Sequence, residues 1–222
     1  MLECVNVGLF MDHMFALCTK DEEEEGNEDG MNILINDQIT QETENVLLEI
    51  LRNFKEATSF QICNWCIQML SCRERRDIGR LRLHCVCLHL SSKFQKWELP
   101  GIVFLLKACQ NLEKLLITMP PFDEEIDLPE DYLMRYEFHA NGYFINETQA
   151  FIHPLQNLKT VEIRNFEGDY QTWEPGSFEM HRFFHGAELG IELMILLRGV
   201  TVNLERVIFS TKKQKHVLPI LG

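Results

Sequence analysis

The chain has 222 residues, of which 45% are hydrophobic and 25% are charged, a composition typical of a folded protein rather than of a disordered or fibrous one. Its formal net charge of -13 at pH 7 excludes a general affinity for nucleic acid or for an anionic membrane surface. Eight cysteines are present, but Glu3 and Asp12 interrupt the apolar start and no basic residue precedes it, unlike a signal peptide. We therefore expect a cytoplasmic or nuclear protein with reduced thiols.

The first segment with a distinctive composition is acidic. Residues 21–29 carry seven acidic side chains and no basic one, and we expect an acidic loop over about residues 19–32. Such a run either attracts a basic partner or is simply a solvated loop. We favour the solvated loop.

Three helices are predicted along the chain. The first covers residues 40–54, with Thr40 as its cap and with Leu47 on the apolar stripe. The second begins at Pro100, because proline suits the first turn of a helix. The third covers residues 187–198, an apolar run close to the C-terminal end of the chain.

Cys63 and Cys66 have the CxxC spacing of redox and zinc sites. A redox pair needs its first cysteine at a helix N-terminus, whereas this motif follows a strand-like segment. A zinc site needs two further ligands. The candidates one repeat further along the chain are His84, Cys85, Cys87 and His89. Because a strand would place Cys85 and Cys87 on one face, we expect buried structural cysteines and no metal site.

Internal repeats connect these elements. Residues 101–117 (GIVFLLKACQNLEKLLI) and 191–209 (IELMILLRGVTVNLERVIF) both read as an apolar helix, a short polar break and Asn-Leu-Glu before a strand. The strands share an apolar triplet with the spacing i, i+3, i+5. It occurs at Ala57/Phe60/Ile62, Leu83/Val86/Leu88, Leu112/Leu115/Ile117, Leu133/Tyr136/Phe138, Leu158/Val161/Ile163 and Leu204/Val207/Phe209. The first positions are 26, 29, 21, 25 and 46 residues apart, close to one or two leucine-rich repeats of about 20–29 residues.

The alternation of helices and strands predicts an α/β protein with a predominantly parallel sheet. Side chains alternate along a strand, so the last two residues of each triplet would face the core together. We therefore expect Phe60, Leu115, Val161 and Val207 to line one shared sheet. The regular spacing favours a short, irregular leucine-rich-repeat solenoid.

Three segments resemble one protein family. Residues 97–117 (WELPGIVFLLKACQNLEKLLI) and 45–71 resemble the repeats of plant F-box/leucine-rich-repeat proteins. Residues 157–168 (NLKTVEIRNFEG), followed by 191–209, resemble the FBD domain that ends those proteins. The resemblance implies degenerate repeats over residues 1–148 and an FBD-type unit over residues 149–222, with an inserted loop at about 169–186.

Members of that family carry an N-terminal F-box, which docks the small adaptor of a cullin–RING ubiquitin ligase, and repeats that hold the target protein. No F-box is visible in this chain, and the FBD-like part is interrupted by residues 169–185, where relatives pass almost directly from bend to helix. The resemblance thus implies the substrate-recognition part of a ubiquitin-ligase receptor. Binding of the ligase adaptor is expected only if an F-box lies upstream.

Nothing in the sequence indicates catalysis. His181 and His185 have helical spacing, but no glutamate completes a metalloprotease motif, and no glycine-rich phosphate loop follows a strand. We expect no catalytic residues, no cofactor and no metal, and a target protein as partner rather than nucleic acid or membrane. Candidate contacts are the variable positions of the strands, namely Glu113, Lys114, Lys159, Glu162 and Arg206.

Two alternatives remain. One is a truncated or free-standing regulator that lacks the F-box and does not dock the ligase. The other is a zinc or redox protein that uses Cys63 and Cys66.

Overall fold

The computed structural model describes residues 4–7, 43–77, 81–120, 151, 154–165, 190, 192–210 and 215–219. Residues 43–53 and 192–200 are helical. The remaining elements are β1 (Cys4–Asn6), β2 (Ser59–Ile62), α3 (Asn64–Asp77), β3 (Cys87–Ser91), the 3-10 turn η1 (Lys96–Glu98), α4 (Leu99–Ala108), β4 (Lys114–Thr118), β5 (Thr160–Arg164), β6 (Arg206–Ser210) and β7 (Lys215–Pro219). No helix in these described ranges is long and apolar enough to cross a membrane.

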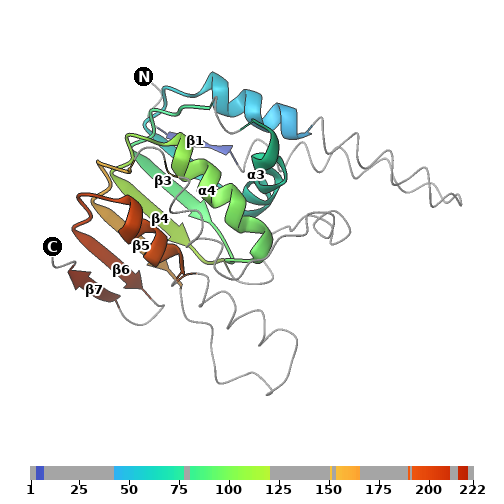
Figure 1. Ribbon diagram of the computed structural model, residues 1–222. Helices are drawn as coiled ribbons and strands as arrows, with labels where there is room; N and C mark the ends of the chain where they lie inside the picture. Colours follow the sequence, from blue (N-terminus) through green and yellow to red (C-terminus); the bar gives the residue numbers. More distant parts are fainter. Residues whose placement is uncertain are drawn as a thin grey trace, which may run out of the picture.

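The strands form one seven-stranded sheet whose spatial order follows the chain from β1 to β7. The first six strands are parallel, and β7 pairs antiparallel with β6. Parallel neighbours need a crossover, and four of the crossovers contain a described helix: residues 43–53, α3, α4 and residues 192–200. All four helices lie on the same face of the sheet (Figure 1). The predicted α/β class and the predominantly parallel sheet are thus confirmed.

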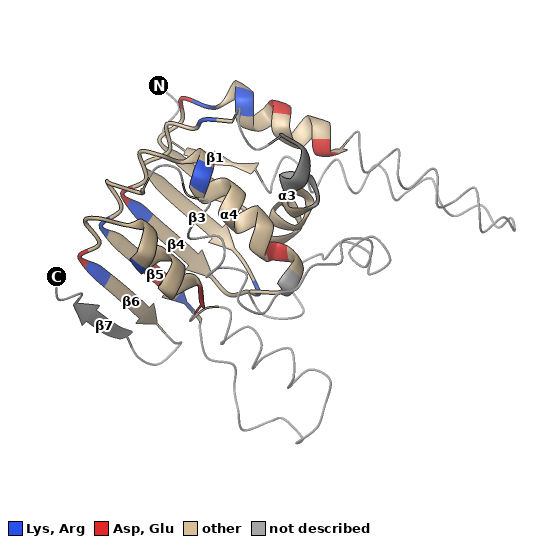
Figure 2. Ribbon diagram, in the orientation of Figure 1, with Lys and Arg blue, Asp and Glu red and all other residues tan. Residues whose placement is uncertain are grey.

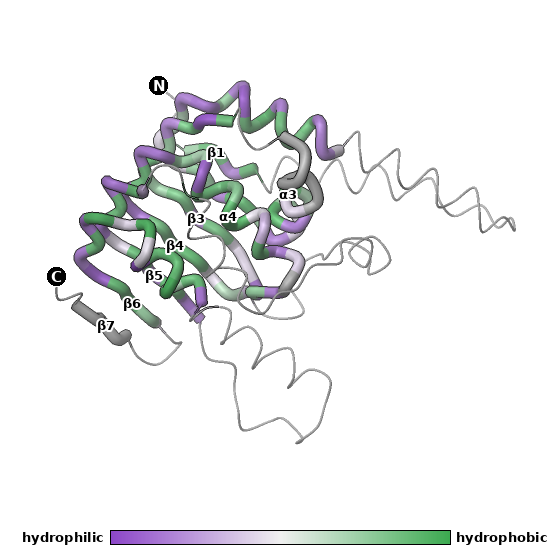
Figure 3. The backbone as a smooth tube through the Cα atoms, in the orientation of Figure 1, coloured by the Kyte–Doolittle hydropathy of each residue, from purple (hydrophilic) through white to green (hydrophobic). Residues whose placement is uncertain are grey.

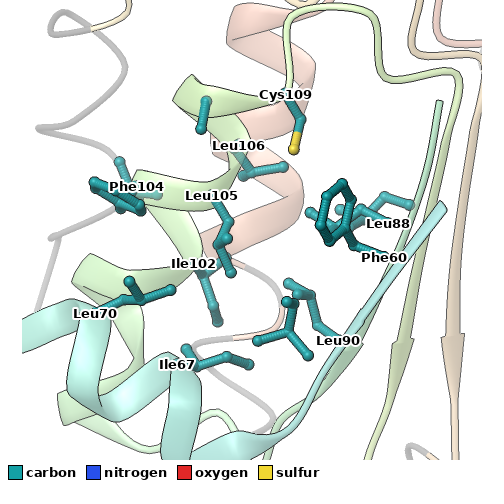
Figure 4. Close-up of a cluster of buried hydrophobic side chains, with 14 of the residues drawn as sticks. Phe60, Ile67, Leu70, Leu88, Leu90, Ile102, Phe104, Leu105, Leu106 and Cys109 are labelled. Carbon is teal, nitrogen blue, oxygen red and sulfur yellow. The ribbon is translucent and has the colours of Figure 1, made fainter. Parts of the chain in front are cut away.

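The helix-covered face is built from alternate strand residues in register. One row across the sheet consists of Phe60, Leu88, Leu115, Val161 and Val207. The expectation that Phe60, Leu115, Val161 and Val207 share a sheet is therefore confirmed. Figure 4 shows Phe60 and Leu88 facing residues of α3 and α4, including Ile67 and Leu105. Each of these four side chains is fully buried, and full burial of a large apolar side chain stabilises the fold by about 1.5–3 kcal/mol.

The connection before each strand repeats the same backbone hydrogen bonds. The carbonyl of Thr58 accepts from the N–H groups of both Val86 and Cys87, at 2.7 and 3.0 Å. The carbonyls of Val86, Glu113 and Lys159 each accept in the same way from two consecutive N–H groups of the following unit. Four successive junctions therefore have one local geometry, although the connecting segments differ in length.

This register corrects one predicted triplet. Leu88 pairs with Phe60 and with Leu115, so the third unit reads Cys85/Leu88/Leu90 and not Leu83/Val86/Leu88. The first positions then become 57, 85, 112, 158 and 204, with steps of 28, 27, 46 and 46 residues. The predicted triplet began at Leu83 because Leu83 is an apolar residue, and the structure shows that it is also buried, at 2% exposure. The position that leucine fills in other units is occupied here by the buried Cys85. The correction changes the first two steps from 26 and 29 residues to 28 and 27, and the step from 112 to 158 spans the predicted triplet at Leu133, which lies outside the described residues.

Helices α3 and α4 touch at Gly101. A Cβ atom on Gly101 would lie only 2.1 Å from the carbonyl oxygen of Ile67, a backbone atom of α3. The hydroxyl of Ser71 donates to that same carbonyl at 3.0 Å and accepts from the N–H of Gly101 at 2.8 Å. The missing side chain of Gly101 thus allows a close crossing, which Ser71 closes with a hydrogen-bonded bridge.

The connection from β3 to α4 is held by a buried carboxylate. Glu98 occupies the N-cap position of α4, and its side chain accepts from the hydroxyl of Ser92 at 2.8 Å and from the N–H of Gln95 at 3.0 Å. Between them, Phe94 is 1% exposed and has a positive φ of 52°. The buried carboxylate therefore fixes the turn that sets the start of α4 over the sheet.

The predicted helices are confirmed where the structure describes them. Leu47 is fully buried, Pro100 is the second residue of α4, and residues 192–200 form a helix. The predicted strand at Leu133/Tyr136/Phe138, the acidic loop at 19–32, the insertion at 169–186 and the 148/149 domain boundary lie outside the described residues. The sequence did not predict β1, α3 or β7.

Candidate functional site

The face of the sheet opposite the helices carries three rows of mostly polar side chains, which we call the polar face. The rows follow from the strand register, because side chains next to each core residue point the other way. The first row is Cys4, Ser59, Cys87, Lys114, Thr160 and Arg206; the second is Asn6, Gln61, His89, Leu116, Glu162 and Ile208; the third is Ser91, Thr118, Arg164 and Ser210.

The charges on the polar face are concentrated on β4, β5 and β6. Lys114, Arg164 and Arg206 are cationic, and Glu162 is the single carboxylate among the rows just described. The described residues of these strands thus give this face a positive balance in a chain whose net charge is -13. Figure 2 shows the basic residues in blue along these strands. The polar face is therefore the more suitable side for a partner that carries carboxylates.

Glu162 forms ion pairs with two cations of the polar face, Lys114 and Arg164. Its side chain is 7% exposed; one carboxylate oxygen accepts from Nε of Arg164 at 2.9 Å, and the other lies 3.8 Å from Nζ of Lys114. The two cations are themselves 45% and 44% exposed, so they remain accessible while the carboxylate between them is buried. This arrangement holds the two positive groups at fixed positions next to Leu116, which is 8% exposed.

His89 occupies the same row on β3. Its Nε2 atom lies 2.9 Å from the hydroxyl oxygen of Thr118, on the neighbouring strand. Burial lowers the pKa of His89 below the usual 6.5, and the positive charges of Arg164 and Lys114 lower it further. The polar face therefore opposes the addition of a further positive charge at its centre.

The predicted contact residues divide into two groups. Lys114, Glu162 and Arg206 lie on the polar face, as described above. Glu113 and Lys159 precede β4 and β5 instead, where their side chains pair at 3.7 Å and are each about half exposed. Such an exposed pair contributes little to stability.

Thr118 and Arg164 were not among the predicted contacts, and His89 was considered only as a possible zinc ligand. Each follows or lies between core residues at a spacing of one position, so the alternation of the strand could have identified them. The incorrect triplet at Leu83 placed His89 outside the predicted strand positions.

The thiols of the described residues do not assemble a metal site. Cys63 directly follows β2, whereas Cys85 lies two residues before β3, so in a parallel sheet the two lie at opposite ends of the strands. His89 lies on the polar face, and His84 pairs with Glu56 at 2.8 Å. Within the described ranges, no group of three or more His, Cys, Asp or Glu side chains could hold a metal ion.

Two expectations about the cysteines are wrong. Cys85 and Cys87 do not share a strand face, because Cys85 is buried in the core before β3 begins and Cys87 points to the polar face. The CxxC motif does lie at a helix N-terminus: Cys63 is the residue before α3, and its carbonyl accepts from the N–H of Ile67 at 3.1 Å. The strand pattern ends at Ile62, one residue earlier than the motif.

The chain was compared with models of protein families, with curated proteins and with solved structures. None of the three comparisons gives a significant match.

Proposed function

We propose that this protein is a non-enzymatic protein-interaction module that holds a target protein on its polar face. The observation that carries the proposal is the order of the sheet. Six parallel strands follow one another in chain order, and the described helices all lie on one side of them, so none of these helices covers the opposite side of the strands. In this arrangement each repeat contributes one strand to a continuous recognition surface.

The repeated junctions support a leucine-rich-repeat solenoid. The same two hydrogen bonds to one carbonyl recur at four junctions, and the leading core position recurs after 28, 27, 46 and 46 residues. Steps of 27 and 28 residues match single leucine-rich repeats, and 46 residues match two. In Figure 3, hydrophobic stretches of the strands and of α4 alternate with hydrophilic connections, in agreement with this repeat.

The family resemblance supports a more specific role, as the substrate-recognition part of a cullin–RING ubiquitin-ligase receptor. It rests on residues 45–71, which include β2, on residues 97–117, which include α4 and most of β4, and on residues 157–168 and 191–209, which include β5 and most of β6. Each of these parts of the chain that resembles the family contributes a strand to the sheet. A free-standing regulator that binds the target without the ligase remains the alternative proposal.

A matched pair of charge reversals tests the interaction surface. Arg206→Glu changes the polar face, and Arg198→Glu makes the same change on the exposed side of the helix at residues 192–200. Each variant and the wild type would be immunoprecipitated from cells of the source organism, and the bound proteins quantified by mass spectrometry. We expect Arg206→Glu to reduce the recovery of a defined set of proteins at least about tenfold, the effect of about 1.4 kcal/mol, and Arg198→Glu to retain them.

The same experiment separates the two roles. Recovery of the ligase adaptor with wild type and both variants supports a ligase receptor, whereas loss of targets without any adaptor supports the free-standing regulator. Identical recovery with all three proteins would show that the polar face does not hold the partner.

A further inference from the structure

The junction of β2 and α3 brings two thiols together. The sulfur atoms of Cys63 and Cys66 lie 3.3 Å apart, within hydrogen-bonding distance. Cys63 is the N-cap residue of the 14-residue helix α3, and Cys66 is the third residue of that helix. A disulfide has a sulfur–sulfur bond of about 2.05 Å, so the two atoms need to approach by roughly 1.3 Å. Side-chain rotation at a helix end can supply a movement of that size.

The two thiols also differ in exposure. Cys63 is partly exposed, whereas Cys66 is fully buried beneath it. A thiol that solvent can reach, backed by a buried thiol, is the arrangement in which an outer sulfur reacts first and an inner sulfur completes a disulfide.

A second pair of thiols provides a contrast within the same molecule. Cys85 and Cys109 are hydrogen-bonded to each other and are both fully buried. This hydrogen bond and the burial raise the pKa of Cys109 well above the usual value of 9.0. Buried thiols of this kind are inert, because the thiolate is the reactive form. Proximity alone therefore does not make a reactive pair in this chain.

We propose that Cys63 and Cys66 form a reversible dithiol–disulfide couple that reacts with small disulfides such as glutathione disulfide. The Cys63 thiol loses its proton to water, and its sulfur attacks one sulfur of the small disulfide, which releases one thiolate that takes up a proton. The Cys66 thiol then loses its proton and attacks the Cys63 sulfur, which expels the second small thiolate. Two protein thiols are oxidised by two electrons, and one small disulfide is reduced to two thiols.

This inference is independent of the proposed recognition function, because the thiol pair lies at the C-terminal end of β2 and not on the polar face. The disulfide would join the residue that follows β2 to the first turn of α3. That turn is the start of α3, the helix that packs against α4 at Gly101. Oxidation would thus lock the N-terminus of α3 to the sheet.

Differential alkylation of the full 222-residue protein tests the couple. The protein would be equilibrated in buffers of defined reduced and oxidised glutathione, its free thiols alkylated, and its peptides analysed by mass spectrometry. We expect the peptide with Cys63 and Cys66 to lose two hydrogen atoms and to escape alkylation as the buffer becomes oxidising. Cys85 and Cys109 should stay reduced throughout and become alkylated only after denaturation.

Substitutions then establish the order of attack. Cys66→Ala should stop the reaction at a glutathione adduct on Cys63, Cys63→Ser should abolish both adduct and disulfide, and Cys109→Ser should leave the couple unchanged. The wild-type measurement stands even if a variant fails to fold.

Three results would overturn the inference. The first is a Cys63 and Cys66 pair that remains reduced in the most oxidising buffer. The second is stoichiometric zinc on the reduced protein that blocks alkylation of the pair. The third is oxidation of Cys85 and Cys109 at the same potential as Cys63 and Cys66.

Discussion

The two faces of the sheet present different kinds of side chain from the same strands. On the helix-covered face, the row from Phe60 to Val161 is fully buried and entirely apolar. On the polar face, the neighbouring row from Gln61 to Glu162 mixes an amide, an imidazole, a leucine and a carboxylate. Alternation along each strand thus separates core residues from residues of the proposed recognition surface within single tripeptides such as Phe60-Gln61-Ile62.

The two faces therefore differ in the substitutions that they tolerate. Core residues have many neighbours and leave a cavity when they are truncated, whereas most of the polar-face side chains are at least partly exposed. Substitutions on the helix-covered face should therefore change the free energy of unfolding, and those on the polar face should mainly change binding.

The largest expected effect is on the helix-covered face. Phe60→Ala removes a ring that is 0% exposed and should lower the free energy of unfolding by about 3–5 kcal/mol. The adjacent Gln61→Ala, on the polar face, should change it by less than about 0.5 kcal/mol. Urea unfolding followed by circular dichroism measures both. Similar losses in the two variants would contradict the assignment of the faces.

The second effect tests the crossing of α3 and α4. In Gly101→Ala the new methyl group meets the backbone of Ile67, which cannot rotate away, so the helices must separate. We expect a loss of about 2–3 kcal/mol in unfolding free energy, despite the better helix propensity of alanine.

The matched control is Gly199→Ala, the same change at an exposed position of the helix at residues 192–200. There the substitution should be neutral or stabilising by up to about 1 kcal/mol. A Gly101→Ala protein as stable as Gly199→Ala would show that the helices do not cross closely at Gly101.

Much of the helix-covered face could be predicted from the sequence, because burial imposes a period. Apolar triplets such as Leu112/Leu115/Ile117 marked four of the strands correctly, and Leu47 marked the first helix. The failure at β3 is instructive: cysteine is as buried as leucine in this core, so a pattern built on aliphatic residues shifted by two positions to Leu83.

Two other elements, β1 and α3, were difficult to predict from the sequence. The strand β1 has three residues, too few to show alternation. The helix α3 begins without the serine, threonine or aspartate that usually caps a helix, since Cys63 occupies the cap position. For that reason the CxxC motif appeared to belong to a strand. The polar-face residues follow no residue-type pattern in the sequence, so they can be recognised only after the core residues of each strand have been correctly assigned.

The smallest expected effect comes from His89, on the polar face. The folded-state pKa of His89 lies below 6.5, so the unfolded chain binds a proton at a higher pH than the folded protein does. The contribution of neutral His89 is complete above pH 6.5 and is lost as the pH falls from there toward the folded-state pKa. His89→Gln, which keeps a polar group opposite Thr118, should remove this part of the pH dependence.

The measurement is the difference in unfolding free energy between wild type and His89→Gln across the range from pH 8 to pH 5. Wild type should lose stability relative to the variant on acidification, and a constant difference would show that the folded protein does not resist protonation of His89.

The pKa of His89 should also respond to a partner bound on the polar face. Carboxylates placed near Lys114 and Arg164 would offset the positive charges that lower the pKa of His89, so an acidic target on the polar face should raise that pKa in an NMR titration. A target bound elsewhere should leave the pKa unchanged.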